Sequence, residues 1–104
     1  MIKTLVRIFL LSISAITLNA QTSGKISGKI IEESSGLPLV GANIIITQTQ
    51  SGTSADEEGF FNLINVSPGK YSVRVMMIGY ESITIENVVV SVNRTTSLDV
   101  EMKM

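Results

Sequence analysis

The stretch from Gly36 to Tyr80 reads GLPLV GANIIITQTQ SGTSADEEGF FNLINVSPGK YSVRVMMIGY, and it decides the fold. Glycine, proline, asparagine and aspartate recur in it at short intervals, and each cluster marks a place where the backbone reverses or kinks. Between the clusters lie runs of Ile, Val, Phe, Thr and Tyr of strand length, with no helical pattern among them. Closely spaced strands of this kind are typical of an all-β sandwich or a small barrel.

The beginning of the chain has a different character. Lys3 and Arg7 give it a basic start, residues 8–18 are apolar with small side chains among them, and Ala20 ends a segment that suits cleavage. This order is that of a secretory signal peptide. The apolar run is short for a membrane span.

A genuine N-terminal helix or a membrane anchor is the alternative to a signal peptide. The polar, turn-prone residues 21–24 that follow at once disfavour it. We therefore predict a cleaved signal peptide over residues 1–20 and a single domain over residues 21–104. The protein is then expected to be exported, and to lie in the periplasm, to associate with the outer membrane or to be secreted.

The composition of residues 21–104 excludes several classes of function. The chain has eight Lys and Arg against nine Asp and Glu; two of the basic residues lie before residue 21, so six against nine leaves a net charge of −3. A mildly acidic domain with scattered basic residues offers no patch for nucleic acid. The chain has no cysteine, which excludes a lipoprotein anchor and leaves the apolar core to hold the fold without disulfides.

Period-two alternation of apolar and polar residues places the strands. We predict strands over residues 25–32, 42–49, 60–66, 71–78 and 83–92 and a last strand that contains Leu98 and runs to the final residue, with a bulge or kink at Glu86-Asn87 and a polar connection over residues 50–55. Residues 37–40 are expected at an edge or in a bend, because Pro38 cannot donate a hydrogen bond to a ladder. The strand faces expected to point inward are those of Phe61 and Leu63, of Tyr71, Val73, Val75 and Met77, and of Leu98, Val100 and Met102.

Ile side chains occur on both faces of residues 42–49, which indicates either cover on both sides or an outer face that meets a partner. Together these segments make about seven strands.

Residues that could perform chemistry are scarce. Without His or Cys there is no zinc site of the usual kind, no Ser–His pair and no thiolate. The carboxylates are interpreted as solvated charges that keep strand edges from pairing; they are Glu32, Glu33, Asp56, Glu57, Glu58, Glu81, Glu86, Asp99 and Glu101. We therefore predict no catalytic, cofactor-binding or metal-binding residues.

Three further features have a structural and a functional interpretation. Asp56-Glu57-Glu58-Gly59 is better explained as a tight turn than as a calcium loop, because the spaced ligands of a calcium loop are missing. Tyr71 alternates in phase with apolar neighbours, so we expect a core residue rather than a sugar contact. Tyr80 follows a glycine, and we expect it to pin a corner between sheets.

The order of turns and strands resembles the carboxypeptidase regulatory-like domain. Six elements carry the resemblance in the family's order and spacing: Gly28–Ile31, Gly36–Ile44, Gly52-Thr53, Asp56–Leu63, Pro68–Tyr71 and Gly79-Tyr80. It covers residues 24–104, and Ala55 departs from the threonine that the family often has beside the aspartate. The resemblance implies an antiparallel, seven-stranded Greek-key β-sandwich like that of transthyretin.

The resemblance also implies a non-catalytic module. With a signal peptide directly before the domain, the arrangement is most similar to the N-terminal extension of TonB-dependent outer-membrane nutrient receptors. The partners would then be the plug and barrel of such a receptor or other envelope proteins. A free-standing secreted module that binds glycans is the alternative, and an enzyme is the least favoured interpretation.

Overall fold

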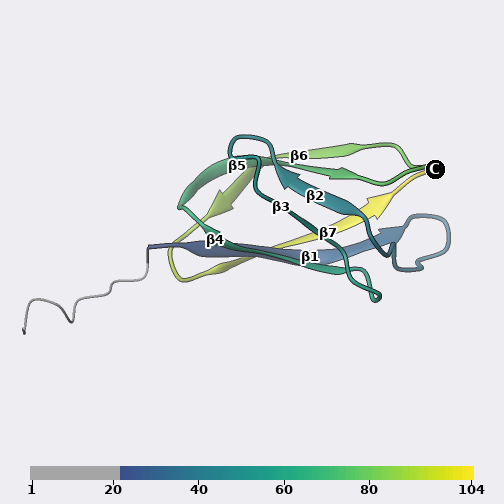
Figure 1. Ribbon diagram of the computed structural model, residues 1–104, viewed down its shortest axis with the longest axis horizontal. Helices are drawn as coiled ribbons and strands as arrows, with labels where there is room; N and C mark the ends of the chain where they lie inside the picture. The colour runs from purple at the N-terminus through teal and green to yellow at the C-terminus, as the bar shows by residue number, and fades with distance from the viewer. Residues whose placement is uncertain (1–21) are drawn as a thin grey trace, which may run out of the picture.

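The computed structural model describes residues 22–104, which form two packed β-sheets (Figure 1). The strands, in chain order, are β1 (Gly24–Glu32), β2 (Asn43–Ile46), β3 (Gly52–Ser54), β4 (Phe60–Val66), β5 (Gly69–Met76), β6 (Ile83–Val90) and β7 (Thr95–Met102). One sheet has the order β4-β1-β7 and the other the order β3-β2-β5-β6. The all-β sandwich is therefore confirmed, whereas the predicted signal peptide lies outside the described residues.

The core fills the space between the two sheets. Ile26 and Ile30 of β1 are fully buried, as are Ile44 and Ile46 of β2. The predicted inward faces are confirmed for Phe61, Leu63, Val73, Val75, Val100 and Met102, which are all buried. Each side chain of this size contributes about 1.5–3 kcal/mol when it leaves water. The core therefore extends from one end of the sandwich to the other.

Tyr71 lies at the border of the core rather than inside it. Its ring is half-buried and packs against the buried cluster. Its hydroxyl donates a hydrogen bond to the Ser67 carbonyl, with an O···O distance of 2.6 Å. The ring therefore points toward the core, as expected, and the hydroxyl at the edge of the core has a hydrogen-bond partner.

The strand predicted over residues 42–49 is shorter than expected. β2 ends at Ile46, and the chain turns through Gln50, which has a φ of 62° and donates its N–H to the Ile46 carbonyl. The segment predicted as a polar connection contains β3, which pairs with β2 in a hairpin. A short polar strand at a sheet edge has no buried face, so alternation could not reveal it.

The prediction of a wholly antiparallel sandwich is wrong at one pair. β1 and β7 run parallel, with Lys25 opposite Thr95 and Glu32 opposite Met102. Both strands begin at the same end of the molecule, where the Asn93 N–H donates a hydrogen bond to the Ser23 carbonyl. Alternation reads the same in both directions along a strand, so the sequence pattern does not carry this information.

Two local irregularities were predicted correctly. The β5–β6 register shifts between Tyr71 and Val73, opposite Glu86-Asn87, and Asn87 has a φ of 59°. Pro38 makes only an isolated bridge with Ile31, at the margin of the three-stranded sheet. Residues that break a ladder are thus placed where the ladder is interrupted.

The turn before β4 is held by one carboxylate and one glycine. Asp56 Oδ1 accepts the N–H groups of Glu58 and Phe60, both at 2.9 Å. Gly59 has a φ of 82°, and a Cβ at this position would lie 2.6 Å from the Ile30 carbonyl oxygen. The predicted tight turn is confirmed, and close packing against β1 is a second reason for glycine.

Gly59→Ala should destabilise the domain more than Gly36→Ala. Both residues have positive φ, which costs a residue with a Cβ about 1–2 kcal/mol. A methyl group at Gly36 would project into open space with no atom within 4 Å, whereas one at Gly59 would also collide with β1. Urea unfolding of the two variants measures the difference. Equal losses of free energy would mean that the contact with Ile30 has no energetic effect.

Candidate functional site

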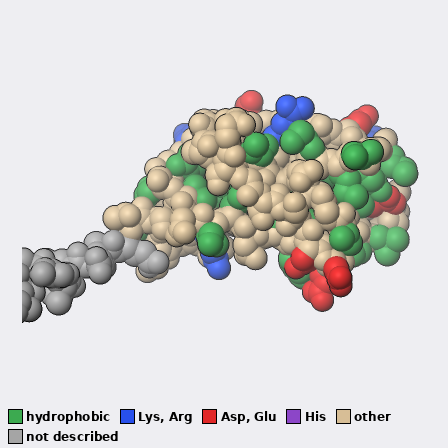
Figure 2. Space-filling view, in the orientation of Figure 1, with side chains coloured by type: hydrophobic (Ala, Val, Ile, Leu, Met, Phe, Trp, Pro, Cys, Tyr) green, Lys and Arg blue, Asp and Glu red, His purple; other side chains and the backbone are tan. Residues whose placement is uncertain are grey.

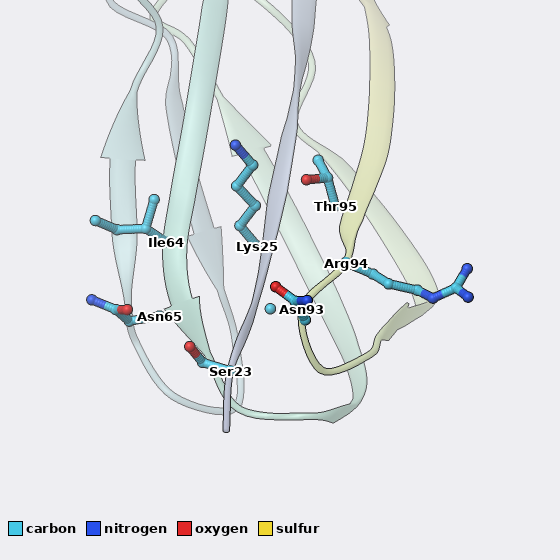
Figure 3. Close-up of a pocket in the computed structure, with 8 residues that line it drawn as sticks. Ser23, Lys25, Ile64, Asn65, Asn93, Arg94 and Thr95 are labelled. Atoms are coloured by element: carbon cyan, nitrogen blue, oxygen red, sulfur yellow. The ribbon is translucent and has the colours of Figure 1, made fainter. Parts of the chain in front are cut away.

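A polar hollow opens at the end of the sandwich where β1 and β7 begin. We call it the terminal hollow; it has a volume of about 300 Å³ and is lined by Ser23, Gly24, Lys25, Ile64, Asn65, Asn93, Arg94 and Thr95. Figure 3 shows Ile64 and Asn65 on one side and Asn93 and Thr95 on the other. The Arg94 guanidinium points away from the other labelled side chains.

Two asparagines in left-handed backbone conformations shape the terminal hollow. Asn65, in β4, has a φ of 56°, and Asn93, before β7, has a φ of 59°. Asparagine tolerates this region better than other residues with a Cβ. The Lys25 N–H bonds to the Arg94 carbonyl at 3.0 Å and so joins the start of β1 to the turn before β7. The two amides are therefore held on a fixed backbone.

The terminal hollow is suited to binding rather than to catalysis. Its lining offers amides, hydroxyls and positive charge. It has no imidazole or carboxylate that could take a proton from Ser23 or Thr95, which general base catalysis would need. Amide and hydroxyl groups match the hydrogen-bonding pattern of a polyol or of an anion.

A second polar cluster joins the two sheets at the opposite end of the domain. Glu32, the last residue of β1, accepts a short hydrogen bond from the hydroxyl of Tyr80, which lies in the β5–β6 connection. The same carboxylate accepts hydrogen bonds from the hydroxyls of Ser34 and Ser35, with O···O distances of 3.0 Å and 2.8 Å. The expectation that Tyr80 pins a corner is confirmed. The interpretation of Glu32 as a merely solvated charge is wrong.

These hydrogen bonds shift the pKa values of both partners. The Tyr80 hydroxyl, helped by those of Ser35 and Ser34, lowers the pKa of Glu32, because a carboxylate that accepts hydrogen bonds is stabilised in its charged form. The same bond raises the pKa of Tyr80, and burial and the negative charge of Glu32 act in the same direction. Both shifts favour neutral tyrosine beside ionised glutamate.

A family model now identifies the domain. The model of the carboxypeptidase regulatory-like domain matches residues 25–103. The chain belongs to this family. A comparison with curated protein sequences gives no significant match.

Solved structures with similar folds have diverse functions. A chain of the type II cohesin–X-dockerin complex of Acetivibrio cellulolyticus is 25% identical, with a TM-score of 0.64 over 74% of this chain and 52% of that one. A putative carbohydrate-binding protein of Bacteroides uniformis is 16% identical, with a TM-score of 0.58 over 75% and 40%. The 3-chlorocatechol 1,2-dioxygenase of Rhodococcus opacus is 12% identical, with a TM-score of 0.59 over 82% and 61%.

These comparisons establish the fold more firmly than the function. The regulatory-like domain spans about half the length of the cohesin–X-dockerin chain and still less of the Bacteroides protein. The two proteins with identities of 16% and 12% share the architecture alone. Together with the family, the range of neighbours indicates a β-sandwich module without a common catalytic site.

The carboxylates of the regulatory-like domain are dispersed over its surface. Figure 2 shows one group of acidic side chains near the β3–β4 loop, which contains the turn of Asp56, and others separately at the upper and right margins of the domain. Within residues 22–104 no three His, Cys, Asp or Glu side chains lie close enough to hold a metal ion. In the same part of the chain there is no helix long and apolar enough to cross a membrane.

The sequence indicated the corner at Tyr80 but neither its partner Glu32 nor the terminal hollow. Asn65 and Asn93 each begin an Asn-x-Ser/Thr tripeptide, and that pattern was the only signal that singled out these residues. Glu32 and Tyr80 are 48 residues apart, so no local pattern could connect them. The terminal hollow forms where the ends of β1, β4 and β7 meet, and the second cluster forms where the end of β1 meets the β5–β6 connection.

Glu32→Gln and Tyr80→Phe should flatten the pH dependence of stability. The pKa of Glu32 is lowered by folding, so its contribution is present above the unfolded value of about 4.3 and is lost as the pH falls through the folded value. The pKa of Tyr80 is raised, so its contribution is lost as the pH rises through the folded value.

Thermal unfolding between pH 3 and pH 11 provides the measurement, and Glu33→Gln at the neighbouring exposed carboxylate is the control. If the melting temperature of Tyr80→Phe changed with pH as steeply as that of the wild type at both the acidic and the alkaline end, the Glu32–Tyr80 hydrogen bond would not stabilise the domain.

Proposed function

We propose that this domain is a non-catalytic interaction module of the cell envelope. In this proposal residues 1–20 export it, and it acts as the periplasmic N-terminal extension of a TonB-dependent outer-membrane nutrient receptor. The observation that carries the proposal is the family match over residues 25–103, which begins directly after a sequence with the order of a signal peptide.

The geometry of the domain agrees with a module inserted in a longer chain. Among the described residues, β1 begins at the left of the domain in Figure 1 and the C-terminal end lies at the right. One cluster of buried residues forms the core and includes Ile26 of β1 and Met102 of β7. An interaction role is further supported by the lack of a general base in the terminal hollow and by the dispersed carboxylates.

Export is tested by expressing the full chain in a Gram-negative host. The protein released by osmotic shock should begin at Gln21, as intact mass will reveal. Leu11→Arg, within the apolar run, should keep the chain uncleaved in the cytoplasm, because a charge interrupts the segment that the export machinery recognises. Val40→Arg makes the same exchange at an exposed residue of the domain and should leave export unchanged. A wild-type chain that remains uncleaved in the cytoplasm would contradict an envelope role.

The receptor assignment is tested separately by the coding sequence downstream of the codon for Met104. An in-frame plug and barrel would support it. A stop codon there would favour the free-standing secreted module.

The terminal hollow supports that second candidate, a module that binds glycans, because its amides and hydroxyls suit sugar hydroxyl groups. Calorimetric titration with soluble glycans should then detect binding that Asn93→Ala weakens. Asn87→Ala is the matched control, because both residues have a φ of 59° and Asn87 lies in the β6 bulge instead. A titration without heat for any glycan would remove this candidate.

A further inference from the structure

Four strands border the two sheets, and three of them are protected against pairing. β3 has only three residues, and β6 is interrupted by its bulge at Asn87. β4 is capped at Phe60, whose carbonyl accepts the Asp56 N–H at 2.9 Å, and it is kinked at Asn65. Such devices prevent unwanted strand addition. β7 has no comparable interruption, because it keeps one register with β1 over all eight of its residues.

The free edge of β7 presents unpaired backbone groups. In a parallel ladder alternate residues direct their N–H and C=O toward the neighbouring strand. The Met102 carbonyl accepts the Glu33 N–H at 2.9 Å, so the even-numbered residues face β1. Ser97, Asp99 and Glu101 therefore direct their backbone groups to the open side, and all three are exposed.

Contacts with the other sheet limit this edge at both ends. Thr96 Oγ1 donates to the Val89 carbonyl at 2.7 Å, and the Lys103 carbonyl accepts the Glu81 N–H at 2.8 Å. Between these contacts, residues 97–101 form what we call the open β7 edge. Its length suits an added strand of about five residues, the usual length of a strand.

The open β7 edge is acidic on its outer face. Asp99 lies opposite Lys29 of β1, and Glu101 lies opposite Ile31. The Lys29 ammonium is placed 5.2 Å from the centroid of the Phe60 ring, on the side of β4 rather than that of β7. A shallow hollow lined by these β1 and β7 residues runs along the face. The Lys29 ammonium thus lies over the Phe60 ring, and the two carboxylates border the open side of β7.

We infer that the open β7 edge binds an extended, basic segment of a partner protein as an added strand. The backbone of Ser97, Asp99 and Glu101 would supply the hydrogen bonds. Lysine or arginine at alternate positions of the segment would lie opposite Asp99 and Glu101, and opposite charges across strands are favourable. A second copy of the same edge would bring like charges together, which disfavours self-pairing. The inference rests on the proposed role as an interaction module and names its surface and partner chemistry.

The test uses an eight-residue, end-blocked peptide in which lysine alternates with threonine and valine. The peptide carries a fluorophore and is titrated with the protein purified after expression of the full chain. Anisotropy should saturate, and a peptide with glutamate in place of lysine should bind at least about tenfold more weakly, which corresponds to about 1.4 kcal/mol. If the lysine peptide does not bind even at millimolar protein concentration, the inference is overturned.

Two matched double variants distinguish the effect of charge at the open β7 edge from the effect of the protein's net charge on peptide binding. Asp99→Lys with Glu101→Lys should weaken binding of the lysine peptide at least about tenfold. Glu57→Lys with Glu58→Lys makes the same change in the exposed β3–β4 loop and should leave binding within about twofold. Equal loss in both variants would mean that the peptide responds only to overall charge.

Backbone pairing is tested by Ser97→Pro, which removes an N–H that faces the open side and none that faces β1. Circular dichroism should report a folded protein, and binding should be lost. Because this variant could also disturb the strand, the lysine peptide is N-methylated at alternate residues as a second test. The methylated peptide keeps its charge and should not bind. Equal affinity for both peptides would overturn strand addition, while the export and receptor tests would be unaffected.

Discussion

The close approach of β1 to β7 is the constraint on which the sandwich depends. β1 is the central strand of its sheet, with β4 on one side and β7 on the other. At Gly28 a Cβ would collide with the Leu98 carbonyl and lie 3.1 Å from the Phe61 ring. Any side chain there would separate β1 from both neighbours. A backbone position without a side chain thus allows the parallel pair to form, and that pair closes the core over Ile26 and Ile30.

The two ends of the sandwich have different properties because different turns meet there. At one end the left-handed Asn65 and Asn93 hold a polar hollow open. At the other end the Glu32–Tyr80 bond ties the three-stranded sheet to the β5–β6 connection. The terminal hollow offers amides and hydroxyls, whereas the carboxylate of Glu32 accepts hydrogen bonds from Tyr80 and from two serines and so serves to join the sheets.

The parallel pair also explains why β7 borders its sheet. β7 follows the short connection after β6 at the end where β1 begins, and it runs beside β1 in the same direction. Its other side is left without a strand. Asp99 and Glu101 are consistent with the general interpretation of the acids as edge protection. Their position on an uninterrupted edge makes them selective, since they repel acidic strands and attract basic ones.

Alternation and turn residues were sufficient to predict the sandwich, the inward faces of β4, β5 and β7, the Asp56–Gly59 turn and the bulge at Asn87. Each of these depends on residues near one another in the chain, where backbone preferences and side-chain period act directly. Strand direction, the short β3, the Glu32–Tyr80 corner and the terminal hollow required the tertiary structure. The parallel pair, the corner and the terminal hollow arise between residues distant in sequence. The β2–β3 hairpin is local, but its short polar strand has no buried face from which alternation could reveal it.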